Sequence, residues 1–294
     1  MHKTPKVLFV GVFDNAGRST NNSQIVALRE NDCRVFGYNY RDKAVSLGAL
    51  GRDKDLVDIV KKHKFDLVIY SKCNMISLKT FEQINELATT CLWFMDPIVS
   101  YNDEMRAKTS LVDYFCCDKK NVLDEAKKVN NASYHVCEGY DERVDKIVSS
   151  STQTNDVSFI GNLYGHREKV IEAAGYPVKN YTNVYGIEHS IAVADTKINL
   201  NICTGDGASD RVYKVLAAGG FLLTDDWAGR GEQFVDGKDL VIFTDTRDLR
   251  DKIGYYLNNS EERQQIASEG SKTVRQYTRH KWASRLLEIY EQTK

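Results

Sequence analysis

Short apolar runs alternate with amphipathic segments along the chain, and this alternation begins twice. The runs are rich in β-branched and aromatic residues, which is typical of strands buried on both faces of a parallel sheet. Segments with helical periodicity separate them, so the pattern predicts an α/β fold with doubly wound parallel sheets. The first series comprises Val7–Val12, Cys33–Tyr38, Phe65–Tyr70, Cys91–Met95, Tyr114–Cys117 and Tyr134–Val136. The second comprises Val157–Ile160, Lys179–Thr182, Ile198–Ile202, Phe221–Thr224 and Leu240–Phe243.

A polar stretch, Asp141–Asp156, separates the two series and is the expected linker. The chain has 294 residues, of which 42% are hydrophobic, and this suits two domains. We therefore expect one Rossmann-like domain over residues 1–145 and a second over residues 146–294, facing a cleft. The chain ends in a helical region, and its last helix is a candidate for crossing back to the first domain. Ligands of such sheets bind at the carboxyl ends of the strands.

Charge and composition exclude several classes of function. The net charge is −1 and neither half is basic, so nonspecific nucleic-acid binding is not expected. The first apolar run is too short for a signal sequence or a membrane span, which favours a cytoplasmic protein. The seven cysteines form no CxxC pair and the six histidines are dispersed. No metal site is predicted.

The segment from Ser209 to Asp226 carries the most chemical information. Ser209 or Asp210 is suited to cap a helix, and Arg211 and Lys214 share one face of its first turns. Free N–H groups with two cations would form a diphosphate site. An ordinary connection from helix to strand, with both cations in solvent, explains the same residues.

The segment reads Ser209-Asp210-Arg211-Val212-Tyr213-Lys214 and is followed by Ala218-Gly219-Gly220. This sequence resembles the donor motif of GT-B glycosyltransferases, especially the CgeB-like group. The resemblance covers roughly residues 156–290 well and the first half more loosely. It implies that Ser209, Arg211, Tyr213 and Lys214 bind the donor. Lys214 replaces the glutamate of the family, and Asp206 stands where many retaining members have a second glutamate.

The start of the second domain adds a candidate phosphate loop. The strand ending at Ile160 is followed by Gly161-Asn162-Leu163-Tyr164-Gly165-His166-Arg167. A glycine after a strand and an arginine opening a helix can face a phosphate, although a turn glycine with a surface arginine fits equally. The resemblance, which extends distantly to phage DNA β-glucosyltransferase, favours donor contacts by Gly161, Asn162, Tyr164 and Arg167. Asn183 follows the next strand and is a further candidate.

The first domain offers a candidate base. Asp96 ends a strand and precedes Pro97, a place that also suits a turn or helix cap. The sequence around Asp96 resembles the sequence around the catalytic aspartate of CgeB-like proteins and of the phage glucosyltransferase. This resemblance implies that Asp96 is the general base. The polar loop after the first strand contains Arg18, Ser19 and Asn22, which are candidates for acceptor contacts or for helix capping.

The resemblance implies transfer of a sugar from a nucleotide-diphosphate donor, with a UDP-sugar favoured, to a hydroxyl acceptor. That acceptor could be a saccharide, a small molecule or a modified DNA base, although the charge does not favour DNA. Loss of the glutamate pair favours inversion of configuration. No cofactor or divalent metal is required by these residues. The alternative is a catalytically idle GT-B protein that binds nucleotide-sugars or acts as a scaffold, because Lys214 departs from the family pattern.

Overall fold

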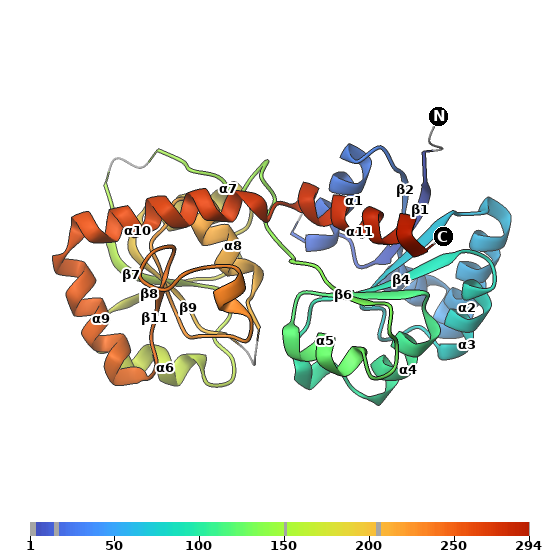
Figure 1. Cartoon of the computed structure of the whole chain (residues 1–294), viewed down its shortest axis with the longest axis horizontal. Coiled ribbons are helices and arrows are strands. Elements are labelled where there is room, and N and C mark those ends of the chain that lie inside the picture. The colour runs from blue at the N-terminus through green and yellow to red at the C-terminus, as the bar shows by residue number, and fades with distance from the viewer. Residues whose placement is uncertain (1–3, 15–17, 150–151, 204–206, 294) are drawn as a thin grey trace. The chain divides into compact units, whose positions relative to one another are not determined.

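The computed structural model describes residues 4–14, 18–149, 152–203 and 207–293. By its contacts, the chain divides into two compact units. Unit 1 contains residues up to Glu138 together with Arg279–Lys294, and unit 2 contains Gly139–Thr278. The last helix, α11 (Arg279–Thr293), therefore belongs to unit 1, where it packs beside α1 (Thr20–Glu30) (Figure 1).

Unit 1 contains a sheet of six parallel strands in the order β2-β1-β3-β4-β5-β6. Its strands are β1 (Lys6–Gly11), β2 (Arg34–Asn39), β3 (Leu67–Ser71), β4 (Thr89–Phe94), β5 (Tyr114–Cys117) and β6 (Ser133–His135). Its other helices are α2 (Tyr40–His63), α3 (Leu78–Asn85), α4 (Asp103–Leu111) and α5 (Lys120–Ala126). A short 3₁₀ helix spans Ile98–Ser100.

Alternate residues of each strand in unit 1 point to opposite faces of the sheet and belong to two different hydrophobic cores. In β1, Val7 and Phe9 pack against α1 and α11, whereas Leu8 and Val10 pack against the helices α2 to α5. Both faces of the sheet are therefore covered by helices. This arrangement explains why each strand is a nearly continuous apolar run.

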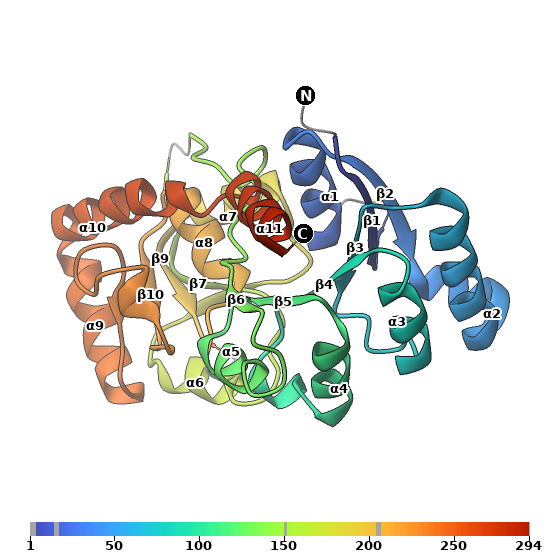
Figure 2. The ribbon, with the colours of Figure 1, turned by 45° about the vertical axis from the view of Figure 1, so that its right-hand side comes forward.

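Unit 2 contains a sheet of five parallel strands in the order β11-β10-β9-β7-β8. Its strands are β7 (Asn155–Ile160), β8 (Val178–Tyr181), β9 (Thr196–Asn201), β10 (Leu222–Thr224) and β11 (Val241–Ile242). Its helices are α6 (Arg167–Ala173), α7 (Ile187–Ala194), α8 (Asp210–Ala217), α9 (Thr246–Asn258) and α10 (Ser260–Thr273), with 3₁₀ turns at Arg230–Glu232 and Val274–Gln276 (Figure 2). The predicted doubly wound fold with a helical C-terminus is confirmed.

The two sheets share one topology. Read from the other edge, the order β8-β7-β9-β10-β11 in unit 2 matches β2-β1-β3-β4-β5 in unit 1. The strand order reverses between β1 and β3 in unit 1, and between β7 and β9 in unit 2. In open parallel sheets, ligands bind outside the carboxyl ends of the strands at this reversal. The ends of β7 and β9 are therefore the first place to look for a site in unit 2.

The structure extends one helix well beyond its predicted bounds. The apolar period of the sequence predicts a helix only over Lys54–His63, whereas α2 begins at Tyr40 and is interrupted at Gly48, where φ is +72°. Its first part is solvent-exposed, with Val45 at 90% and Leu50 at 88% exposure. A helix without a buried face leaves no apolar period in the sequence, which is why this part was missed.

Candidate functional site

The carboxyl end of β7 brings a glycine and an arginine together. Gly161 has a φ of +144°, in the region that favours glycine, and a Cβ there would lie 2.5 Å from Nη2 of Arg211. The guanidinium of Arg211 reaches back from the first turn of α8. Its Nε donates to the carbonyl of Ile160 at 2.5 Å, and its Nη1 donates to Oδ1 of Asn201 at 2.8 Å. Gly161 is thus needed for the arginine to lie against the strand.

A second arginine lies beside this one. Arg167, at the start of α6, is 2% exposed and donates to the carbonyls of Ile202 at 3.0 Å and Asn162 at 3.2 Å. The guanidinium carbons of Arg167 and Arg211 lie 5.4 Å and 4.4 Å from the ring centroid of Phe159. Phe159 therefore contributes a cation–π contact to both arginines.

Among the described residues, these two cations have no carboxylate partner. In the parts of unit 2 that the structure describes, no carboxylate oxygen lies within 4.0 Å of either guanidinium. Burial, and next the charge of Arg167, lower the pKa of Arg211 to about 10. Arg211 is still a cation at neutral pH. Two adjacent positive charges that lack a counter-charge form a site suited to an anion.

The N-terminus of α8 lies next to Arg211. Ser209 occupies the N-cap position but makes no side-chain cap hydrogen bond. Its Oγ instead donates to Oδ1 of Asn201 at 3.0 Å. The sequence prediction that Ser209 or Asp210 could cap the helix is therefore not met by Ser209. The first N–H groups of α8 receive no acceptor from the Ser209 side chain, and such groups favour an anion.

Asn201 was missed in the sequence, although it holds the site together. Its Oδ1 accepts from both Ser209 and Arg211, and its Nδ2 donates to Oγ1 of Thr224 at 2.9 Å. The side chain is fully buried at the end of β9. The available signal was a polar amide inside the apolar run Ile198–Ile202, at the carboxyl end of a predicted strand.

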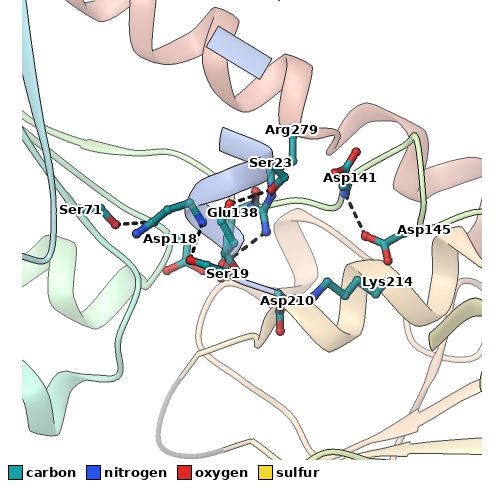
Figure 3. A network of polar contacts seen from close by, with 12 residues as sticks. Ser19, Ser23, Ser71, Asp118, Glu138, Asp141, Asp145, Asp210, Lys214 and Arg279 are labelled. Carbon is teal, nitrogen blue, oxygen red and sulfur yellow. Dashed lines mark hydrogen bonds and ion pairs between the residues drawn. The ribbon is translucent and has the colours of Figure 1, made fainter. Parts of the chain in front are cut away.

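Lys214 is in an ion pair. Its Nζ lies 2.6 Å from Oδ2 of Asp210, one turn earlier in α8 (Figure 3). His189 of α7 is 5% exposed, and its Nδ1 makes no hydrogen bond. Burial, and then the positive charge of Lys214, lower the pKa of His189 to about 3, so its ring is neutral at pH 7. His189 was also not among the predicted site residues.

The other predicted donor residues occupy different surroundings. Asn162 and Asn183 are exposed, and Asn183 adopts a left-handed backbone with φ of +58°. Tyr164 is 54% exposed, and the centroid of its ring lies 4.4 Å from the guanidinium carbon of Arg167. Tyr213 is fully buried and packs on Phe234 and Tyr277, in the interior of unit 2. Asp206 lies outside the described residues.

In unit 1, Asp96 follows β4 and pairs with a lysine. Nζ of Lys72 lies 2.5 Å from Oδ1 of Asp96, whose side chain is 35% exposed. Lys72 and Cys73 have φ of +63° and +54°, a rare conformation for two consecutive non-glycine residues. The fully buried Lys108 donates to the carbonyl of Cys73 at 3.1 Å. The turn is thereby held in the form that presents Lys72 to Asp96.

The predicted acceptor loop is organised by Asp14. Its carboxylate accepts from the backbone N–H groups of Arg18 at 2.9 Å and Ser19 at 2.5 Å. Ser19 is the N-cap of α1, and its Oγ accepts from the N–H of Asn21. Asn22 donates through Nδ2 to the Asp14 carbonyl at 2.7 Å. Ser19 therefore has the role of a helix cap, which was one of its two predicted roles. The side chain of Arg18 is exposed.

A buried set of charges occupies the carboxyl edge of the unit 1 sheet, after β5 and β6. Nζ of Lys119 lies 2.6 Å from Oδ2 of Asp118, and both side chains are nearly inaccessible. Arg279, at the start of α11, lies between Ser23 and Glu138 (Figure 3). Its Nη2 is 3.5 Å from Oε1 of Glu138, and its Nη1 donates to the Glu138 carbonyl. These cations all have carboxylate partners.

Two further findings concern metals and membranes. Among the described residues, no group of three or more His, Cys, Asp or Glu side chains could hold a metal ion. Asp225 accepts from the Cys203 N–H at 2.9 Å, and Asp226 pairs with Arg230 at 3.0 Å. Of the helices in the described ranges, none is both long enough and apolar enough to cross a membrane.

A family model described as glycosyl transferase-like matches residues 143–291, just over half of the chain. Comparison with the curated proteins gives no match. Anabaena HepE in complex with UDP-glucose is 12% identical, with a TM-score of 0.75 over 98% of this chain and 100% of HepE.

Two other solved structures have the same fold. A glycosyltransferase from Rickettsia africae is 11% identical, with a TM-score of 0.68 over 99% of each chain. The N-terminal domain of Candida albicans trehalose-6-phosphate phosphatase is 10% identical, with a TM-score of 0.71 over 99% of this chain and 97% of that one. The two parallel sheets and these likenesses show the GT-B fold.

Proposed function

Because the chain belongs to the glycosyl transferase-like family and is a glycosyltransferase with the GT-B fold, we propose that it transfers a sugar from a UDP-sugar to a hydroxyl acceptor. The observation that carries the proposal is the pair Arg167 and Arg211, which lie together at the ends of β7 and β9 and have no carboxylate partner in the described ranges. The diphosphate of a donor would supply the missing negative charge. HepE, a structure with the same fold, is described with UDP-glucose.

The diphosphate would be bound by three kinds of donor. Arg167 and Arg211 provide charge-assisted hydrogen bonds, and the first N–H groups of α8 provide neutral ones. Gly161 allows the backbone to approach the ligand, and Tyr164 and Asn162 line the same loop. As the bond to the sugar breaks, negative charge accumulates on the departing diphosphate. Cations already held in place by Ile160, Asn201 and Ile202 stabilise that charge without rearrangement.

Lys214 has a smaller part in this proposal. Its ammonium is engaged by Asp210, so it contributes less positive charge to the diphosphate than either arginine does. The family glutamate at this position would accept hydroxyl hydrogens, whereas an ammonium can only donate. We therefore propose that Lys214 changes how the sugar or ribose hydroxyls are bound, and that residues 139–278 form the donor-binding part of the enzyme.

Asp96 is the proposed general base. The pair with Lys72 occupies Oδ1, whereas no hydrogen bond from the described residues reaches Oδ2. That oxygen is suited to accept the proton of an attacking hydroxyl, which leads to inversion at the anomeric carbon. Lys72 acts as a positioning residue, because it fixes the carboxylate through the turn that Lys108 supports.

The first experiment screens nucleotide-sugars by thermal shift on the full chain. A donor present at 100 times its Kd stabilises the fold by about 2.7 kcal/mol. We expect UDP-linked sugars to raise the melting temperature more than GDP-, CMP- or dTDP-linked ones. If no nucleotide-sugar shifts the melting temperature, the proposal fails at the donor site.

The second experiment tests the base. Asp96→Asn should lower the rate of sugar transfer by about 10²- to 10⁴-fold, because proton transfer in the transition state is lost, while UDP affinity stays unchanged. Asp124→Asn is the matched control, since Asp124 is exposed on α5. Transfer rates and the anomeric configuration of the product are measured. Equal activity in the two variants, or retention of configuration, would contradict this role. UDP binding without any turnover in the wild type would favour the idle alternative.

A further inference from the structure

A cavity in unit 2 lies at the opposite edge of the sheet from the arginine pair. Its volume is about 470 Å³, within the range of small-molecule sites. It is lined by Lys197, near the amino end of β9, and by Ala218-Gly219-Gly220, which follow the carboxyl end of α8. Asn201, Ser209 and Arg211 occupy the other ends of the same strand and helix. None of them lines this cavity.

The charged side chains that line the cavity are all cations. Lys197, Arg263, Lys272 and Arg275 reach it, and no aspartate or glutamate does. Two of these cations have carboxylate partners outside the lining. Lys197 pairs with Asp156 at 2.6 Å, and Lys272 pairs with Glu269 at 2.6 Å.

The two arginines lack such partners in the part of the chain that the structure describes. Arg263 is 6% exposed, and its Nη1 donates to the carbonyl of Tyr256. No carboxylate oxygen in the described ranges lies within 4.0 Å of Arg263 or Arg275. Burial lowers the pKa of Arg263, which reflects the cost of keeping a charge away from water. An anion in the cavity would offset that cost.

One face of α10 shapes the charged wall. Arg263, Ala267 and Ser271 are spaced four residues apart, so they lie above one another on the helix. The small side chains of Ala267 and Ser271 leave room in front of Arg263. The wall therefore offers a guanidinium and a hydroxyl to a ligand that enters beside the helix.

The remaining wall is aliphatic. Ile147, Val193 and Ala218 line it, and Ile147 is 64% exposed. Phe221 also contributes, but it is 3% exposed and its ring packs on Tyr256 at 4.7 Å between centroids. The cavity thus presents little aromatic surface on which a nucleobase could stack. Its chemistry fits an anionic head and a short aliphatic body.

We propose that this cavity binds a soluble phosphate ester with a short aliphatic body, at a site separate from the donor site. The phosphate lies at the cationic wall of the cavity, which includes Arg263 and Arg275, and the aliphatic part lies against Ile147, Val193 and Ala218. This site does not depend on the identity of the donor. Because α8 and β9 each run from this cavity to the arginine pair, a ligand here is placed to act as an effector.

Calorimetric titration of the full chain tests the ligand class. Hexyl phosphate is compared with inorganic phosphate and glucose 6-phosphate. We expect hexyl phosphate to bind about tenfold or more tighter than either, because burial of even two methylenes contributes that much. Hexyl phosphate should still bind when UDP saturates the donor site, because the two ligands occupy separate sites. No binding of hexyl phosphate, equal affinity for glucose 6-phosphate, or competition by UDP would overturn the proposal.

Variants locate the site. Arg263→Gln and Arg275→Ala should each weaken hexyl phosphate binding by about tenfold, the loss of one charge-assisted contact. Arg247→Ala, on the exposed face of α9, is the matched control and should bind like the wild type. Arg275 is exposed, so its variant tests the site even if Arg263→Gln fails to fold. Equal affinity of Arg275→Ala and Arg247→Ala would contradict the assignment.

A membrane lipid with a phosphate headgroup also combines an anionic head with an aliphatic body. Vesicles of phosphatidylcholine with and without phosphatidic acid distinguish it from a soluble ester. We expect the chain to stay in the supernatant with both. The proposal of a soluble ligand would be overturned if the chain sediments with phosphatidic acid vesicles and Arg275→Ala abolishes this sedimentation.

Discussion

The two units share one strand order but treat charge differently at the carboxyl ends of their strands. In unit 1, Lys72 pairs with Asp96, Lys119 with Asp118, and Arg279 with Glu138. In unit 2, Arg167 and Arg211 lie side by side with no carboxylate partner among the described residues. The same strand order thus carries paired charges in unit 1 and, in the described part of unit 2, two arginines without a carboxylate partner.

This difference separates structural charges from binding charges. A buried ion pair satisfies its own members and fixes side chains in place, although its net contribution to stability is small. Two neighbouring cations without a partner repel each other and retain a desolvation cost. Such an arrangement is useful when a ligand supplies the opposite charge. The comparison therefore supports our proposal that unit 2 binds the anion and that the charges of unit 1 position side chains.

Breaking the buried pair of unit 1 should have the largest effect on stability. Arg279→Met removes the cation from the buried carboxylate of Glu138 and should lower the free energy of unfolding by about 3–5 kcal/mol. Arg285→Met is the control, because Arg285 is exposed in the same helix and pairs with Glu288 at the surface. It should cost no more than about 1 kcal/mol.

Urea denaturation gives both values. Trp93 and Trp282 pack against each other in unit 1 at 5.6 Å between centroids, so their fluorescence follows this unit. Equal losses in Arg279→Met and Arg285→Met would show that the buried pair is no more important than a surface pair. UDP affinity should be unchanged in both variants.

A smaller effect is expected from His189, the neutral group near the cations of unit 2. Its pKa is about 3 in the folded chain and 6.5 without the fold. Below pH 6.5 the unfolded chain gains a proton that the folded chain does not, so stability falls as the pH drops from 6.5 towards 3. By pH 5 the loss is about 2 kcal/mol.

Urea denaturation at pH 7 and pH 5, followed by far-UV circular dichroism, measures this loss. His189→Gln should lose this part of the pH dependence, whereas His166→Gln, which changes an exposed histidine, should keep it. If His189→Gln and the wild type lose the same stability on acidification, His189 is not held neutral by its surroundings.

Much of the fold could be predicted from the sequence because each buried strand is a short apolar run. All eleven strands match predicted runs, with small differences at their ends. The first part of α2 could not be predicted, since its exposed residues Val45 and Leu50 give no helical period. Gly48 interrupts that helix as well.

Less of the candidate site than of the fold could be predicted from the sequence. Gly161, Arg167, Ser209 and Arg211 come from motifs, and the structure brings them together. The contacts of Asn201 depend on strand pairing between distant segments, which local periodicity does not specify. Tyr213 follows Arg211 by two residues and so lies on another face of the helix, which is buried; its place among the predicted donor residues came from the motif and not from the helical spacing.

The arginine pair can also be tested by supplying the missing charge. Asn201→Asp places a carboxylate where Oδ1 of Asn201 lies 2.8 Å from Arg211. This change should lower UDP affinity by about tenfold, because the new ion pair competes with the diphosphate. Full UDP affinity in Asn201→Asp would contradict the view that an unbalanced cation makes the site.

The most direct measurement is a calorimetric titration of UDP against the wild type, Arg211→Ala and the control Arg247→Ala. The arrangement of Arg211 against Ile160, Asn201 and Phe159 predicts that its loss weakens UDP binding by about tenfold or more. Arg247→Ala should bind UDP like the wild type. Unchanged UDP affinity in Arg211→Ala would contradict the assignment of the donor diphosphate to the carboxyl ends of β7 and β9.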